Sequence, residues 1–179
     1  MCIRDRIYGQ SAIKDETIRA LCSWKTNSAA APTIIGLEGP PGVGKTSYAK
    51  ALGKIMDRPL AFISLGGMND VAVLTGHSYT YESSSHGLLA QTLINCKSNS
   101  PVIVFDEVDK IPHDSSRAQE IVSLLIHLTD PASNHEIHDR YIAGVPLDFS
   151  RACFVFTMND SRRVSPVLLD RMMLMRMET

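Results

Sequence analysis

Short runs of apolar residues alternate with helical patterns along most of the chain. Four runs are apolar at nearly every position, and each predicts a buried strand; they are 33–38, 60–65, 101–106 and 152–157. Apolar residues at helical spacing predict helices at 45–56, 87–96 and 117–128. Strands that are apolar on both faces and alternate with helices predict an α/β fold, with a parallel sheet flanked by helices.

The composition is that of an ordinary globular protein and excludes few functions. The 179 residues are 44% hydrophobic and 21% charged, enough for one domain with its own core. The net charge of -1 gives no general argument for a nucleic-acid partner. The four cysteines are far apart, which argues against a zinc or redox site. No apolar run approaches the ~20 residues needed to span a bilayer, so a membrane partner is not expected.

A glycine-rich segment follows the first predicted strand and opens the first predicted helix. It reads Gly39-Pro40-Pro41-Gly42-Val43-Gly44-Lys45-Thr46 and fits the P-loop pattern G-x-x-x-x-G-K-[ST] in full. Glycines let the backbone N–H groups point at phosphate oxygens, and the helix N-terminus adds partial positive charge. We expect Lys45 to contact the outer phosphates of ATP and the Thr46 hydroxyl to be a Mg²⁺ ligand.

The third predicted strand ends in two adjacent carboxylates, Asp106 and Glu107. Successive side chains on a strand point to opposite faces, so the two acids are expected to have different roles. Asp106 is predicted to bind Mg²⁺ through its water shell, and Glu107 to orient and deprotonate the attacking water. An acidic strand end alone is equally consistent with a simple cap, but the P-loop upstream favours catalysis. Two acids also favour hydrolysis over transfer of the phosphate to another substrate.

Two later positions complete the predicted site. Asn159 follows the fourth strand, where its amide can bind the attacking water or the terminal phosphate, although a turn-capping Asn fits the local sequence equally well. Arg171 ends a short predicted helix at 166–171. It is either an ordinary salt-bridge residue or an arginine that stabilises the transition state at a neighbouring subunit's nucleotide.

The order of these four motifs resembles that of the AAA+ superfamily, and the sequence between them resembles Lon proteases. The similar stretches are 7–10, 64–70, 76–77, 80–81 and 168–172. The resemblance covers nearly everything from about residue 7 onward. It implies a P-loop NTPase fold of the AAA+ large-subdomain type, in which Tyr8 and Gly9 lie beside the adenine of ATP. It also resolves the roles of Asn159 and Arg171 in favour of catalysis.

The same resemblance implies the partners of the protein. In Lon proteases the Tyr81 position lies on a loop in the central pore of a homo-hexamer, where an aromatic side chain grips an unfolded or damaged protein substrate. Glu82 follows on this loop, but Glu82-Ser83 replaces the aliphatic residue and glycine usual in that family. The usual Gly-Asp-Pro approach to the helix after the acidic strand is also missing. These departures concern substrate grip and the second pore loop rather than ATP binding.

The two ends of the chain give further expectations. Residues 1–6 resemble the translation of a sequencing adapter, so we expect a non-native tail there and an AAA+ large subdomain over 7–179, truncated at its C-terminus. The sequence contains neither the helical lid nor the Ser-Lys peptidase dyad of the family. The expected compartment is the cytoplasm or the mitochondrial matrix.

The leading hypothesis is a Mg²⁺-dependent ATPase that powers protein unfolding and translocation in a Lon-like ATP-dependent serine protease. One alternative is an AAA+ remodelling chaperone without a peptidase. A nucleic-acid-associated AAA+ ATPase is less favoured, because of the neutral charge and the Lon-like stretch 76–81. A non-enzymatic nucleotide-binding module is the least favoured, because every catalytic position is filled.

Overall fold

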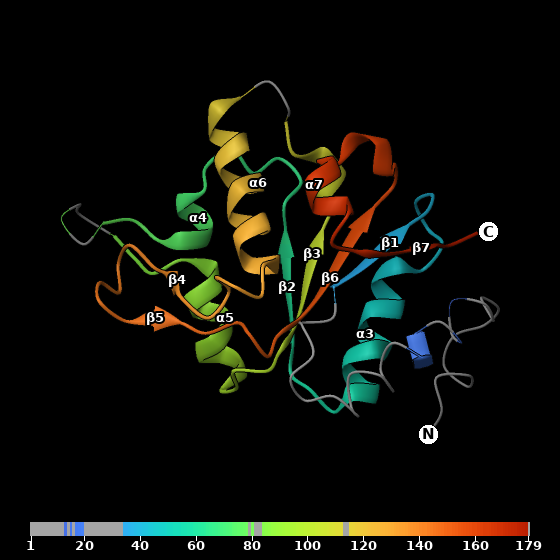
Figure 1. Cartoon of the computed structure of the whole chain (residues 1–179), viewed down its shortest axis with the longest axis horizontal. Coiled ribbons are helices and arrows are strands. Elements are labelled where there is room, and N and C mark those ends of the chain that lie inside the picture. Colours follow the sequence, from blue (N-terminus) through green and yellow to red (C-terminus); the bar gives the residue numbers. More distant parts are fainter. Residues whose placement is uncertain are drawn as a thin grey trace.

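A parallel five-stranded sheet forms the centre of the computed structural model, in the order β2-β3-β6-β1-β7 (Figure 1). The structure describes residues 13, 15, 17–19, 34–78, 80, 84–112 and 115–178. Four of the predicted site residues lie outside the described residues: Tyr8, Gly9, Tyr81 and Glu82.

The sheet strands are β1 (Ile34–Glu38), β2 (Leu60–Ser64), β3 (Val102–Asp106), β6 (Cys153–Met158) and β7 (Met173–Arg176). The described helices are α3 (Lys45–Met56), α4 (Ala72–Thr75), α5 (Leu88–Cys96), α6 (Ser116–Thr129) and α7 (Pro166–Leu169). Two short 3₁₀ helices, η1 (Val108–Lys110) and η2 (Ser161–Arg163), follow β3 and β6. A small antiparallel pair consists of β4 (Ile137–His138) and β5 (Pro146–Leu147).

The four predicted strands and the three longer predicted helices are confirmed, with ends that differ by one residue at most where the residues are described. The short helix predicted at 166–171 is present as α7, which ends at Leu169. The sequence did not predict β7, which pairs in parallel with β1 at the edge of the sheet. Its four residues are too few to show a hydrophobic periodicity, and they begin only two positions after Arg171.

Helices cover both faces of the sheet (Figure 1). Alternate residues of each strand enter two separate cores. Ile103 and Phe105 of β3 pack in the cluster that includes α5 and α6, whereas Val102 and Val104 pack in the cluster that includes α3. All four side chains are fully buried. This two-sided burial explains why the strands read as continuous apolar runs, and it confirms the predicted α/β architecture.

The carboxyl ends of β1, β3 and β6 lie side by side, because all the sheet's strands are parallel. From β1 the chain crosses through α3 to the far edge strand β2, and from β6 it passes through α7 to β7 at the opposite edge. The connections that leave the neighbouring strands β1 and β6 therefore run toward opposite edges of the sheet. Ligands of open α/β sheets bind at such a switch point, beyond the carboxyl ends of the strands.

Candidate functional site

A cavity of about 370 Å³ lies at this switch point, and most of the predicted site residues that the structure describes line it. The P-loop, the end of β3 and the end of β6 supply its walls. The structure thus brings together Lys45, Thr46, Asp106, Glu107 and Asn159, which come from three separate parts of the sequence. The other lining residues that the structure describes are Pro41, Gly42, Gly44, Ser47, Asp109, Lys110, Thr157 and Met158.

The P-loop backbone needs glycine at two positions. Gly42 and Gly44 have φ angles of 87° and 91°, in the left-handed region that other residues rarely adopt. Nothing lies within 4 Å of a Cβ built at either position, so conformation rather than space requires glycine. Gly44 is also the N-cap of α3, whose first turn contains no acidic residue. The partial positive charge of this helix end is therefore available to an anion in the cavity.

Lys45 connects the P-loop to the end of β6. Its Nζ donates to the carbonyl oxygens of Gly39 and Pro40, at 2.6 and 3.0 Å, and to Oδ1 of Asn159 at 2.9 Å. Partial burial lowers the pKa of the Lys45 ammonium, while the carboxylates of Asp109 and Asp106 act in the opposite direction. The ammonium thus lies against the wall of the cavity, with the predicted Asn159 amide beside it.

The two adjacent acids both line the cavity, but Glu107 is not the continuation of the strand that the sequence predicts. Asp106 is the last residue of β3, but Glu107 has a left-handed backbone with φ of 61°. The strand pleat therefore does not continue through Glu107 and cannot place the two side chains on opposite faces. The Asp106 carboxylate accepts a hydrogen bond from the Thr157 hydroxyl, and the Glu107 carboxylate pairs with Lys110.

Gly66 makes room for the Glu107 carboxylate. It lies just beyond β2, next to the end of β3. A Cβ at this position would collide with Oε2 of Glu107. Gly66, in the stretch 64–70 that resembles Lon proteases, thus lies in direct contact with a predicted catalytic side chain.

Arg171 is not among the described residues that line the cavity. It follows α7, and its guanidinium donates to the Ile126 carbonyl oxygen at 3.1 Å and to the Asp130 carboxylate at 3.3 Å. Both acceptors lie at the C-terminal end of α6, where a positive charge is favourable. The structure therefore shows the salt-bridge arrangement for Arg171 and does not bring it to its own chain's site.

Thr157 and Asp109 are two of the lining residues that the sequence did not predict, and both bond the predicted ones. The Thr157 hydroxyl bonds Asp106 and also accepts the backbone N–H of Glu107 at 3.2 Å. Oδ2 of Asp109 accepts the backbone N–H of Asn159 at 3.1 Å. The available signal was a polar residue within an apolar strand and a second aspartate three positions after the first. Neither feature says which partners the fold will place beside it.

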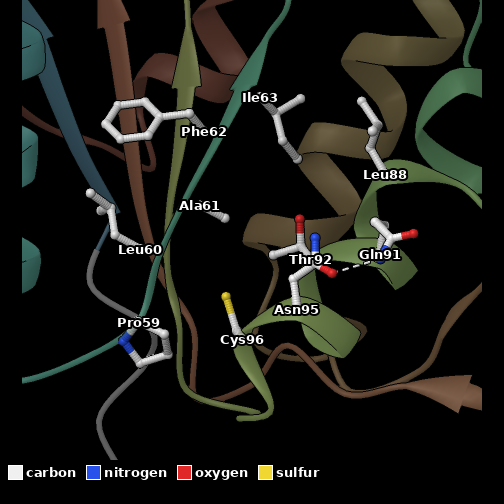
Figure 2. Close-up of a pocket in the computed structure, with 10 residues that line it drawn as sticks. All are labelled: Pro59, Leu60, Ala61, Phe62, Ile63, Leu88, Gln91, Thr92, Asn95 and Cys96. Carbon is white, nitrogen blue, oxygen red and sulfur yellow. Dashed lines mark hydrogen bonds between the residues drawn. The ribbon is translucent and has the colours of Figure 1, made fainter.

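A second hollow, of about 310 Å³, lies between the edge strand β2 and α5 (Figure 2). None of the ten residues drawn there is charged, and Gln91 and Asn95 are hydrogen-bonded to each other at 2.7 Å. The residues drawn there therefore offer no charged side chain to a phosphate group or a metal ion.

The fold and the first cavity together define a P-loop nucleotide-binding protein. The sequence matches the ATPase family associated with various cellular activities (AAA) over residues 35–178, so the chain belongs to the AAA family. Within that family it is an AAA+ module of the Lon type, which confirms the resemblance inferred from the sequence.

Three relatives illustrate the similarity. The chain is 38% identical over 170 residues to a Lon protease homolog of Acanthamoeba polyphaga mimivirus, covering 94% of the chain and 16% of the relative. It is 45% identical over 139 residues to the peroxisomal Lon protease homolog 2 of Pichia angusta, covering 78% of the chain and 15% of the relative. It is 37% identical over 165 residues to the mitochondrial Lon protease homolog of Kluyveromyces lactis, covering 92% of the chain and 15% of the relative. The chain thus spans about a sixth of the length of each of these relatives.

Within the described part of the chain, every helix is too short or too polar to cross a membrane.

Proposed function

We propose that the P-loop cavity binds ATP together with Mg²⁺ and hydrolyses the terminal phosphate. The observation that carries this proposal is the meeting of Lys45, Asp106, Glu107 and Asn159 around one cavity, although they come from three separate segments of the sequence. Membership of an ATPase family supports the same chemistry.

The residues present fit a magnesium ion. The Thr46 hydroxyl and the Asp106 carboxylate line the same cavity, and both offer the hard oxygen ligands that Mg²⁺ prefers. When bound, the ion would neutralise part of the phosphate charge. Thr157 donates to Oδ1 of Asp106 and so restricts the rotation of this carboxylate.

The remaining roles follow from the contacts of each side chain. Lys45 exchanges the carbonyls of Gly39 and Pro40 for phosphate oxygens, since a charged acceptor binds the ammonium more strongly than a neutral one. Asn159 stays beside Lys45 and binds the attacking water or the terminal phosphate. Glu107 orients that water and accepts its proton.

The test is Glu107→Gln, which keeps the size of the side chain but removes its basicity. We expect ATP turnover to fall by about a hundredfold or more, with nucleotide affinity nearly unchanged. The lost pair with Lys110 has little effect on stability, because both side chains are well exposed. Glu120→Gln, at an exposed position on α6, is the control and keeps full turnover. Turnover by Glu107→Gln at the parent rate would overturn the role of Glu107.

The wider function we propose is protein unfolding and translocation in a Lon-like ATP-dependent protease that assembles as a homo-hexamer. The names of the relatives support this, together with the resemblance of 64–81. In that assembly Arg171 would act at the neighbouring subunit's nucleotide, Tyr8 and Gly9 would contact the adenine, and Tyr81 and Glu82 would contact the substrate polypeptide. The two proposed compartments are the cytoplasm and the mitochondrial matrix; one relative is named mitochondrial, and another is named peroxisomal.

A further inference from the structure

Asp109 is a buried carboxylate at the cavity that the proposed mechanism does not use. It lies in η1, directly after the acidic pair, and only 3% of its surface is exposed. Its Oδ2 accepts the backbone N–H groups of Asn159 and Asp160, at 3.1 and 3.4 Å. Its Oδ1 is buried and has no hydrogen-bond partner among the residues that the structure describes. A buried carboxyl oxygen without a hydrogen-bond partner is uncommon in folded proteins, so a role for Asp109 at the site would explain its presence.

The position of Asn159 depends on contacts beyond the sheet. The pairing of β3 with β6 ends at Phe105 and Phe156. Past that point side chains hold the two strand ends together: Thr157 bonds the Asp106–Glu107 segment, and Asp109 bonds the backbone at Asn159. The β1 strand holds β6 as far as Met158, and on the β3 side the Asp109 carboxylate bonds the next backbone N–H, that of Asn159. The amide oxygen of Asn159 in turn accepts a hydrogen bond from the Lys45 ammonium.

We propose that Asp109 is a positioning residue for ATP hydrolysis, holding the Asn159 turn so that the Asn159 amide faces the terminal phosphate and the attacking water. This inference rests on the proposed function of the cavity. Asp109 acts through Asn159 and need not contact the nucleotide. A carboxylate suits this role, because one oxygen can accept two adjacent backbone N–H groups without a competing donor of its own.

Two substitutions separate this role from a general loss of structure. In the protein that carries this chain, Asp109→Ala is expected to lower the turnover number for ATP roughly tenfold to hundredfold, because small displacements of a positioning group cost that much. The affinity for ADP is expected to change little. Asp109→Asn keeps an oxygen that can accept the Asn159 N–H, and it is expected to recover most of the lost turnover.

A double-mutant cycle shows whether Asp109 acts through Asn159. Asn159→Ala alone is expected to lower turnover, and adding Asp109→Ala to it is expected to cause little further loss, since the side chain being positioned is already gone. Equal losses in both backgrounds would contradict the proposal. So would an Asp109→Asn variant as slow as Asp109→Ala.

Asp139→Ala is the matched control. Asp139 is equally buried at 3% exposure and accepts the backbone N–H groups of Gly87, Tyr141 and Ile142, but it is not among the described residues that line the cavity. We expect its loss to lower the melting temperature while turnover per folded molecule is kept. If Asp139→Ala lowered turnover as much as Asp109→Ala, a general effect of losing a buried acid would replace the proposal. If the parent protein itself did not hydrolyse ATP, the proposed function would fail first, and the two failures are thus distinct.

Discussion

Glu38, at the end of β1, shows how one side chain at the edge of the site joins three segments. Its Oε1 accepts the Ser161 backbone N–H at 2.9 Å, and its Oε2 accepts from Nε of Arg176 at 3.1 Å. Partial burial acts to raise the pKa of Glu38, but the hydrogen bonds from Ser161 and the contact with Arg176 outweigh it and leave the pKa lowered. Ionised Glu38 therefore stabilises the packing of η2 and β7 against β1.

This lowered pKa predicts a pH dependence of stability. Because the folded-state pKa lies below the ordinary value of 4.5, the stabilisation is fully present above that value and is lost as the pH falls through the folded-state pKa. Glu38→Gln should be less stable than the parent at neutral pH, and the difference should shrink on acidification to about pH 3. Urea unfolding at several pH values measures it. A difference that is constant or grows on acidification would contradict this account.

At the residue scale, the predictable part of the site was the part contiguous in sequence. The P-loop spans eight consecutive residues, so its pattern fixes the backbone turn and the helix start together. Thr157 and Asp109 act across two strand ends that lie 50 or more positions apart in sequence. Only the register of β3 against β6 brings them together, and that register cannot be read from either strand alone.

At the scale of elements, the long and strongly patterned segments were predicted, whereas of the short ones only the helix α7 was. The strands β1, β3 and β6 are buried on both faces, so their sequences are apolar at nearly every position. The pair β4 and β5 has two residues in each strand, and β7 has four. Elements of this length are held by their neighbours, as β7 is by its pairing with β1, and therefore leave little trace in the sequence.

The left-handed residue Glu107 shows a second limit at this scale. The sequence places it as the next residue of a strand, whereas the backbone leaves the strand there and enters η1. With this turn both acids line the cavity, and the Asp109 carboxylate lies within hydrogen-bonding distance of the Asn159 backbone N–H. A non-glycine residue in this conformation is strained and is typical of functional sites.

At the scale of the whole molecule, the position of Arg171 bears on assembly. It lies against the end of α6, with 29% of its side chain exposed, and does not join its own chain's cavity. A role in catalysis therefore requires a second copy of the chain. This agrees with the proposed homo-hexamer, in which each cavity would be completed by its neighbour.

The proposed protein substrate also belongs to this scale. In the protein that carries this chain, we expect an unfolded protein such as casein to stimulate ATP turnover, because work on the substrate is coupled to hydrolysis. Double-stranded DNA is the comparison, and we expect it to have no effect, consistent with the net charge of -1. Stimulation by DNA but not by casein would favour the nucleic-acid-associated alternative.

The central claim, that this cavity is an ATP site, is tested most directly by calorimetric titration with ATP in the presence of Mg²⁺. Lys45→Ala and Lys50→Ala form a matched pair, since both lysines lie on α3 but Lys50 is exposed and lies over the Phe62 ring instead of the cavity. We predict that the parent binds ATP, that Lys50→Ala binds equally well, and that Lys45→Ala loses roughly tenfold to hundredfold in affinity, since a charged hydrogen bond contributes about 1.5–3 kcal/mol. Equal affinities for all three proteins would contradict the account.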